Sequence, residues 1–294
     1  MRNPGQAFAH ARTPLDATYD PGVPPTDAST SNLLVDDPRP GVRRLTLNRP
    51  EKRNALDNTL RSELFDALRE SDMNGEVHVT ILRGAGPCFS SGYDLGSDLS
   101  ADRPNYTAGG DGSWSRQVTE GWLSLWDLAK PVIAQIHGYA MAGGSELAAA
   151  CDLVYLADDA TISHPVLRVA GTPDFAVHPW LVGLRNAMEM ALTGESVTAS
   201  EAVRVGYANR AFPADHLDDA VLAIAERMAE VPTELLQLNK RWIYRAMEAM
   251  GARTAIRAAT DLGALAQKAP GVQQNLADLR NRIRGAVSGN PPGH

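Results

Sequence analysis

Apolar positions along the chain switch between the spacing of strands and the spacing of helices. Short apolar runs at 33–35 and 42–47 flank a turn-prone segment, which predicts a hairpin. Leu60, Leu64 and Leu68 then fall on one stripe, as they do in a helix that packs one face on a core. Further strands are predicted at 77–82, 132–136 and 152–156, and further helices at 114–128 and 143–150. This alternation indicates an α/β core.

The last third of the sequence has mainly helical spacing. From about residue 176 onward helices dominate, and they include 217–229, 233–249 and 253–266. We therefore predict four parts along the chain: a disordered arm at 1–30, a core at 31–200, a helical region at 201–286 and a loose tail at 287–294. The arm and the tail are rich in Pro, Thr, Asp and Ser and offer little apolar surface to bury.

Charge and composition exclude several classes of protein. Lys and Arg number 28 against 35 Asp and Glu in 294 residues, and this acidic balance argues against nucleic-acid binding through a broad basic surface. Cys88 and Cys151 cannot form a disulfide framework. The most apolar stretch, 131–157, is interrupted by polar residues and glycines, and the N-terminus lacks a hydrophobic signal core. We expect a soluble, cytoplasmic protein with neither nucleic-acid nor membrane partners.

Two glycine-containing turns follow predicted strands and offer candidate chemistry. The segments are 88–95 and 137–147, and glycine allows such turns to leave backbone N–H groups uncommitted. The second turn enters a helix, whose first N–H groups lack internal partners and carry the positive end of the dipole. Two donors aimed at one point would stabilise an oxyanion.

Simpler explanations of these turns also exist. Glycines after strands often only make turns. A phosphate-binding loop is excluded because the sequence contains neither GxxxxGK(S/T) nor GxGxxG. A serine-hydrolase elbow is excluded because Leu147 stands where a second glycine would follow Ser145.

The order and the amino-acid sequences of several segments resemble those of the crotonase (enoyl-CoA hydratase/isomerase) superfamily over about residues 32 to 285. The matching pieces are LNRPEKRNAL at 47–56, FSSGYDL at 89–95, KPVIA at 130–134, GYAMAGGSEL at 138–147 and CD at 151–152. The resemblance implies a spiral of ββα turns with a helical C-terminal trimerisation region, assembled as a homotrimer or a dimer of trimers. It also implies acyl-CoA thioester substrates, with coenzyme A as part of the substrate and no separate cofactor.

The resemblance assigns roles to particular residues. The backbone N–H groups of Tyr93 and Gly143 would form the oxyanion hole. Glu146 matches the first catalytic glutamate, which holds or deprotonates water; alternatively it is a carboxylate favoured by the dipole in a first helical turn. The residues expected to contact coenzyme A are Lys52, Arg53, Asn54, Tyr93, Asp94 and Leu95. Late in the chain, Lys240 is expected on a solvated helix face or against coenzyme A phosphates.

The second catalytic carboxylate of hydratases is missing from its usual place. Val166, in His164-Pro165-Val166, stands where the family carries glutamate. Asp174 resembles the aspartate of a Pro-Asp-Gly-Gly loop in isomerase-like members and could replace it, or it could cap a helix beginning near residue 176. His164 and His178 are acid–base groups by type, although histidines beside prolines are more often incidental.

The acyl end of the pocket is expected to be shaped by Val166, Phe175, His178 and Trp180. No metal is expected, because no cluster of ligand residues has suitable spacing. We predict hydration of a trans-2-enoyl-CoA. The alternatives are an isomerase or acyl-CoA hydrolase that uses one glutamate, and a weakly catalytic acyl-CoA-binding protein.

Overall fold

The computed structural model describes residues 31–98, 104, 110, 112–169 and 171–287. The chain divides into two units, residues 1–31 and 32–294, and the account below concerns the second. The arm predicted at 1–30 and nearly all of the predicted tail lie outside the described residues, so both stay predictions.

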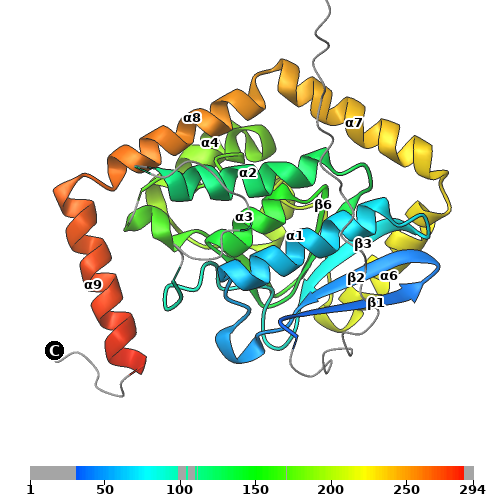
Figure 1. The fold of residues 1–294 in the computed structure, drawn as a ribbon, viewed down its shortest axis with the longest axis horizontal. Helices are drawn as coiled ribbons and strands as arrows, with labels where there is room; N and C mark the ends of the chain where they lie inside the picture. The colour runs from blue at the N-terminus through cyan, green and yellow to red at the C-terminus, as the bar shows by residue number, and fades with distance from the viewer. Residues whose placement is uncertain (1–30, 99–103, 105–109, 111, 170, 288–294) are drawn as a thin grey trace, which may run out of the picture. The chain divides into compact units, whose positions relative to one another are not determined.

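A six-stranded sheet forms the centre of this unit (Figure 1). Its order is β1-β2-β3-β4-β6-β9, with β1 antiparallel to β2 and every other pair parallel. The strands are β1 (Leu33–Arg39), β2 (Gly41–Leu47), β3 (Val77–Gly84), β4 (Val132–Ile136), β6 (Leu153–Ala157) and β9 (Arg210–Phe212). The predicted α/β alternation is confirmed. Strand β9 belongs to this sheet although it lies beyond residue 200, where we placed the boundary of the core, so the expected helical region also contributes to the core.

A second, three-stranded sheet was not predicted. It contains β5 (Tyr139–Met141), β7 (Thr161–Ser163) and β8 (Val197–Thr198), with β5 parallel to β7 and β7 antiparallel to β8. These strands have two or three residues each, too few for alternation to be recognised.

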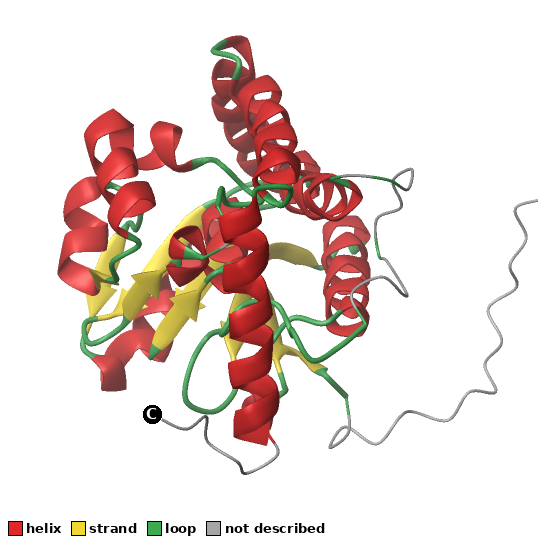
Figure 2. Cartoon of the chain, turned by 90° about the vertical axis from the view of Figure 1, so that its left-hand side faces the viewer, coloured by secondary structure: helices red, strands yellow, loops and turns green. Residues whose placement is uncertain are grey.

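Helices lie on either side of the strands (Figure 2). They are α1 (Asn58–Met73), α2 (Ser113–Asp127), α3 (Gly143–Ala150), α4 (His178–Thr193), α5 (Ala199–Val205), α6 (Leu217–Ala229), α7 (Thr233–Ala249), α8 (Ala252–Ala266) and α9 (Pro270–Val287), with 3-10 turns at Pro50–Lys52, Pro165–Arg168 and Ala214–His216. The predicted leucine stripe is confirmed, because Leu60, Leu64 and Leu68 are buried in the core. Helix α1 begins where the Asp57 carboxylate accepts the Leu60 N–H at 2.8 Å.

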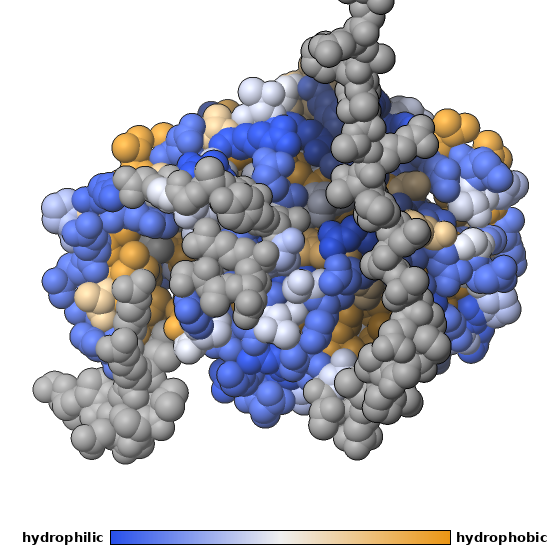
Figure 3. All heavy atoms as spheres, in the orientation of Figure 1, coloured by the Kyte–Doolittle hydropathy of each residue, from blue (hydrophilic) through white to orange (hydrophobic). Residues whose placement is uncertain are grey.

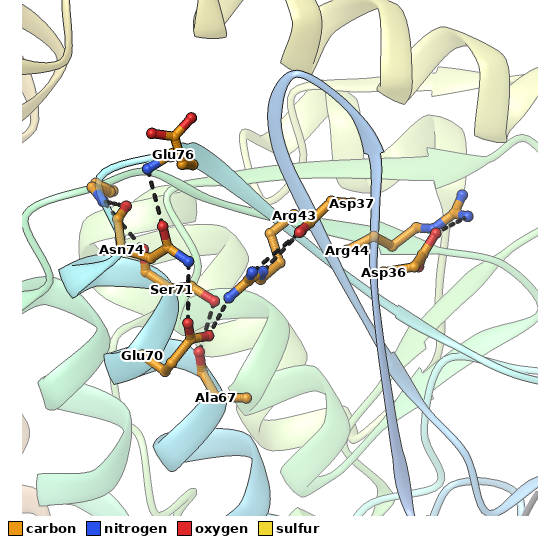
Figure 4. A network of polar contacts seen from close by, with 10 residues as sticks. Asp36, Asp37, Arg43, Arg44, Ala67, Glu70, Ser71, Asn74 and Glu76 are labelled. Carbon is orange, nitrogen blue, oxygen red and sulfur yellow. Dashed lines mark hydrogen bonds and ion pairs between the residues drawn. The ribbon is translucent and has the colours of Figure 1, made fainter. Parts of the chain in front are cut away.

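Two arginine–carboxylate pairs join the strands of the first hairpin, and a third pair ties it to α1 (Figure 4). Arg43 on β2 contacts Asp37 at 2.9 Å and also pairs with Glu70 on α1. Beside it, Arg44 pairs with Asp36 at 2.7 Å. The turn is shorter than expected, since β1 runs through the Asp36–Arg39 segment and reverses just before Gly41, whose φ is 74°.

Lys240 on α7 corrects both expectations for that residue. Its side chain is buried, and Nζ donates to the carbonyl oxygens of Leu125 at 2.9 Å and Lys130 at 3.0 Å. It also pairs with Asp152 at 2.9 Å. Burying a cation requires such a complete set of acceptors, so Lys240 joins α7 to the core.

The visible surface in Figure 3 is mostly hydrophilic, with separate apolar patches. No helix in the described ranges combines the length and hydropathy needed to cross a membrane. Several large apolar side chains of α7 and α8 are nevertheless exposed: Leu235, Leu238, Trp242, Ile243, Leu262 and Leu265.

Candidate active site

The two glycine turns lie against each other at the start of α3. Met141 N–H donates to Ser90 O at 2.9 Å, joining the turn before α3 to the segment before Tyr93. A Cβ at Gly92, whose φ is 93°, would lie 2.9 Å from Met141 O and 3.1 Å from Gly143 N. Glycine is therefore required where the turns meet, and the contact places Gly143 N–H next to the Gly92–Tyr93 peptide.

The backbone N–H groups of Tyr93 and Gly143 are unused by the fold. Gly143 is the first residue of α3, so its N–H has no partner within the helix. Among the described residues, neither N–H donates to a protein acceptor. Ala142, the residue directly before Gly143, has a φ of 47°, a conformation that is strained for a residue with a Cβ. This geometry suits a pair of donors for an oxyanion.

Glu146 lies one turn into α3 with its carboxyl group buried. Its side chain is 1% exposed. Oε2 accepts the Tyr93 hydroxyl at 2.7 Å, and Oε1 accepts the Asp174 N–H at 2.9 Å. Burial raises the pKa of Glu146 to about 7, and the hydrogen bond from Tyr93 and those from backbone N–H groups oppose that rise.

Asp174 lies beside Glu146 and does not cap a helix. Helix α4 begins at His178, and its N-cap residue, Val177, makes no side-chain cap. The Asp174 carboxyl group instead takes hydrogen bonds from Ser115 and Trp114 on α2. Burial, and then the charge of Glu146, raise the pKa of Asp174 to about 7. The capping alternative is wrong, and the structure brings the two predicted carboxyl groups together.

The Tyr93 side chain links these groups to α2. Its hydroxyl accepts Trp122 Nε1–H at 3.2 Å while donating to Glu146, and its ring meets Trp114 edge-on at 5.3 Å. The ring also lies against Gly143, where a Cβ would be 2.6 Å from Tyr93 Cζ. Tyr93 therefore narrows the space beside the N–H pair.

Arg61 on α1 is a buried cation of the site that the sequence analysis missed. Its side chain is fully buried, with the guanidinium carbon 5.4 Å from the Trp114 ring and 5.6 Å from the Trp122 ring. The spacing to Phe65, four residues later and also buried, was the available signal that Arg61 faces inward.

An apolar cavity of about 210 Å³ lies next to His164, whose ring contacts Glu146. His164 Nε2 is 3.5 Å from Glu146 Oε1, and His164 Nδ1 is 3.3 Å from Ser145 Oγ. Burial lowers the pKa of His164 to about 4, and burial followed by the nearby His164 lowers that of His178 to about 4, so both rings are neutral at pH 7. The cavity wall comprises Ser145, Ile162, Ser163, His164, Leu167, Pro173, Ala176, His178, Pro179, Leu184, Ala187, Met188, Met190, Ala191 and Glu195.

The predicted acyl-pocket residues divide around this cavity. His178 lines it, whereas Val166, Phe175 and Trp180 are absent from its described wall. Phe175 is fully buried and packs edge-on against Trp126 at 5.7 Å. Sequence reasoning therefore located the correct loop and missed most of the wall, of which nearly half comes from α4.

The predicted coenzyme A segment is partly structural. Asn54 is fully buried: its Oδ1 accepts Arg49 N–H at 2.9 Å, and its Nδ2 donates to Ala85 O at 2.8 Å and Cys88 O at 2.9 Å. The polar side-chain atoms of Asn54 therefore serve the fold, and contact of this residue with coenzyme A stays a prediction.

The remaining residues of that segment lie nearer the surface. Lys52, Arg53 and Leu95 are exposed, and Asp94 is partly buried. Asp94 pairs with Arg49 at 2.9 Å and Lys52 at 3.3 Å, and these contacts lower its pKa against the opposing effect of burial. The contact of these residues with coenzyme A stays a prediction. In the described ranges no group of His, Cys, Asp and Glu side chains is arranged to hold a metal ion.

Comparison with known proteins identifies the family. The model of the enoyl-CoA hydratase/isomerase family matches residues 38–273. The chain belongs to this family. EchA13 of Mycobacterium tuberculosis, whose name places it among enoyl-CoA hydratases, is 36% identical over 245 residues, covering 76% of this chain and 75% of that protein.

Solved structures agree with the family assignment. An enoyl-CoA hydratase/isomerase of Xanthobacter autotrophicus Py2 superposes with a TM-score of 0.78 at 32% identity, covering 88% of this chain and 96% of that one. A monofunctional enoyl-CoA isomerase of Mycobacterium smegmatis superposes with a TM-score of 0.62 at 30% identity, covering 76% and 98%. The predicted crotonase fold is confirmed, and the chain is a crotonase-family enzyme whose relatives include both hydratases and an isomerase.

Proposed function

We propose that this enzyme hydrates a trans-2-enoyl-CoA, with Glu146 and Asp174 as its acid–base pair. The observation that carries the proposal is the position of two buried carboxyl groups beside two free backbone N–H groups. The family's second glutamate is replaced by Val166, and Asp174 supplies a carboxyl group in its stead.

The reaction follows from these positions. The thioester oxygen accepts the N–H groups of Tyr93 and Gly143, which stabilise the enolate as negative charge develops on that oxygen. Water loses a proton to the ionised carboxylate while its oxygen bonds to the β-carbon, and the double-bond electrons move toward the thioester. The protonated carboxyl group then delivers a proton to the α-carbon as the electrons return, so the product is a 3-hydroxyacyl-CoA.

A shared proton explains how two carboxyl groups do both tasks. Burial raises the pKa of each, and ionising one opposes ionising the other, so the pair holds one proton near pH 7. One carboxylate and one carboxylic acid then coexist, as general base and general acid require.

Isomerisation of a 3-enoyl-CoA is the second candidate. It needs one base that moves a proton between two carbons, and the retention of Glu146 without a carboxylate at 166 favours it. The similarity to a solved isomerase supports keeping this alternative.

The test compares the two substrates on one enzyme. We expect loss of conjugated thioester absorbance when the protein is mixed with trans-2-enoyl-CoA, and no such loss with Glu146→Gln. Conversion of 3-enoyl-CoA without hydration of 2-enoyl-CoA would assign the isomerase. Tight binding of acyl-CoA without turnover of either would assign the weakly catalytic binding protein.

We further propose that the substrate is an acyl-CoA thioester with an apolar acyl group, and that the enzyme is a homotrimer or a dimer of trimers. The apolar wall of the cavity next to His164 supports the first point, and the exposed apolar side chains of α7 and α8 support the second. Light scattering on the purified protein tests the assembly. The cytoplasmic location stays a prediction.

A further inference from the structure

Arg61 is a fully buried cation with an incomplete set of hydrogen-bond partners. Its Nη1 donates to Asn58 Oδ1 at 3.2 Å, and within the described structure Nε and Nη2 have no partner. Guanidinium groups in a protein interior are normally paired, because burying an uncompensated charge is costly. A role is therefore needed to explain this one.

Two tryptophans connect Arg61 to the carboxyl pair. Trp122 lies against the guanidinium and donates its Nε1–H to Tyr93, whose hydroxyl in turn donates to Glu146. Trp114 also lies against the guanidinium, contacts the Tyr93 ring and bonds the Asp174 carboxyl group. Aromatic faces attract a cation, so both tryptophans fix where the positive charge lies.

The charges around the cluster leave Arg61 as its counterion. Burial lowers the pKa of Arg61, and the charges of Asp174 and Glu146, which come from two different segments, oppose that shift. His164, which contacts Glu146, and His178, whose ring meets that of His164, are neutral at pH 7 because burial lowers the pKa of each.

We propose that Arg61 is a positioning residue that keeps one negative charge on the Glu146–Asp174 pair. The inference rests on the proposed function, in which that pair is the acid–base unit. Without the buried positive charge, the pair loses its compensation in a poorly solvated site and retains both protons to higher pH. The general base is then missing at neutral pH.

Three variants test the proposal through the pH dependence of kcat/KM. Arg61→Met removes the charge and retains an apolar chain, Arg61→Lys keeps the charge, and Lys240→Met removes a different buried cation as a matched control. We expect Arg61→Met to move the acidic limb upward by about one pH unit, which is about a tenfold loss of activity on that limb. Arg61→Lys should move the acidic limb by less than half as much. Lys240→Met should lower the unfolding midpoint and leave the acidic limb where it is in wild type.

A second readout separates this proposal from the proposed function. The carboxylic-acid C=O infrared band, assigned by its loss in Glu146→Gln and Asp174→Asn, reports protonation of the pair even if no substrate turns over. The band should persist to higher pH in Arg61→Met than in wild type. A folded Arg61→Met with wild-type infrared titration would overturn the proposal, as would an equal shift in Lys240→Met. If Arg61→Met does not fold, Arg61→Lys decides, because it keeps the positive charge. A near-native infrared titration of Arg61→Lys supports the proposal. A titration in which the carboxyl pair keeps both protons at pH 7 contradicts it.

Discussion

The hydroxyl group of Tyr93 donates a hydrogen bond of 2.7 Å to Glu146 Oε2. The same residue offers its backbone N–H toward the predicted oxyanion site, so position 93 contributes to the site through both main chain and side chain. The hydroxyl favours the ionised form of Glu146, and it also accepts Trp122 Nε1–H. Tyr93 is therefore more than a bulky wall of the pocket.

Tyr93→Phe should reduce kcat/KM by about tenfold at pH 7, because a hydrogen bond to a charged group contributes about 1.5 kcal/mol. The acidic limb of the pH profile should move upward, because Glu146 loses a donor that favours its charged form. The backbone N–H is retained, so the KM should change little. Steady-state kinetics of trans-2-enoyl-CoA hydration from pH 5 to 9 measures both effects, and an unchanged profile would show that the hydroxyl contributes nothing to the base.

Gly143→Ala should reduce turnover more than Tyr93→Phe does. A Cβ at 143 would lie 2.6 Å from Tyr93 Cζ, so the ring must move and the contact with Glu146 is lost. The shift also disturbs the adjacent N–H donor, and loss of one such donor costs on the order of 10²-fold in kcat. Gly75→Ala is the matched control, because a Cβ there meets nothing within 4 Å. Equal activity of the two variants would contradict the packing described here.

Glu146→Gln should stabilise the folded protein at pH 8 and leave it nearly unchanged at pH 4. Burial raises the folded-state pKa of Glu146 to about 7, above its unfolded value. A carboxyl group shifted in this direction favours folding while protonated, and that contribution is lost as pH rises from about 4.5 through 7. The glutamine has no proton to lose, so its advantage at pH 8 should be about 3 kcal/mol.

Urea unfolding at the two pH values provides the measurement. Glu189→Gln, a substitution at an exposed position of α4, serves as the control and should show no comparable difference. A Glu146→Gln protein that is less stable than wild type at pH 8 would mean that Glu146 is not held in a medium that disfavours its charge.

Much of the fold could be predicted because its pattern is local. Helices α6 and α7 have the predicted ends, 217–229 and 233–249, since a helix of three or more turns repeats its apolar spacing several times. The strands β5, β7 and β8 could not be predicted in the same way, because two or three residues show no alternation and pair only through tertiary contacts.

The residues of the candidate site could be predicted where they lie within one sequence motif. They could not be predicted where only the tertiary fold brings them together. Glu146 and Gly143 came from one glycine-rich segment, which fixes the turn and the helix start together. The proximity of Asp174 to Glu146 depends on a loop 28 residues further along the chain. Arg61 was missed because an arginine among leucines in a helix normally points to solvent, whereas here two tryptophans from α2 enclose it.

The most direct test of the central claim is the hydration rate of Asp174→Asn. The measurement follows loss of enoyl-thioester absorbance under single-turnover conditions, with wild type, Glu146→Gln and the exposed-site control Asp159→Asn alongside. If the two carboxyl groups act as one acid–base pair, Asp174→Asn should fall about 10²-fold or more, to a level near that of Glu146→Gln, while Asp159→Asn keeps the wild-type rate. An Asp174→Asn enzyme that hydrates at the wild-type rate would contradict the claim that Asp174 replaces the carboxylate missing at Val166.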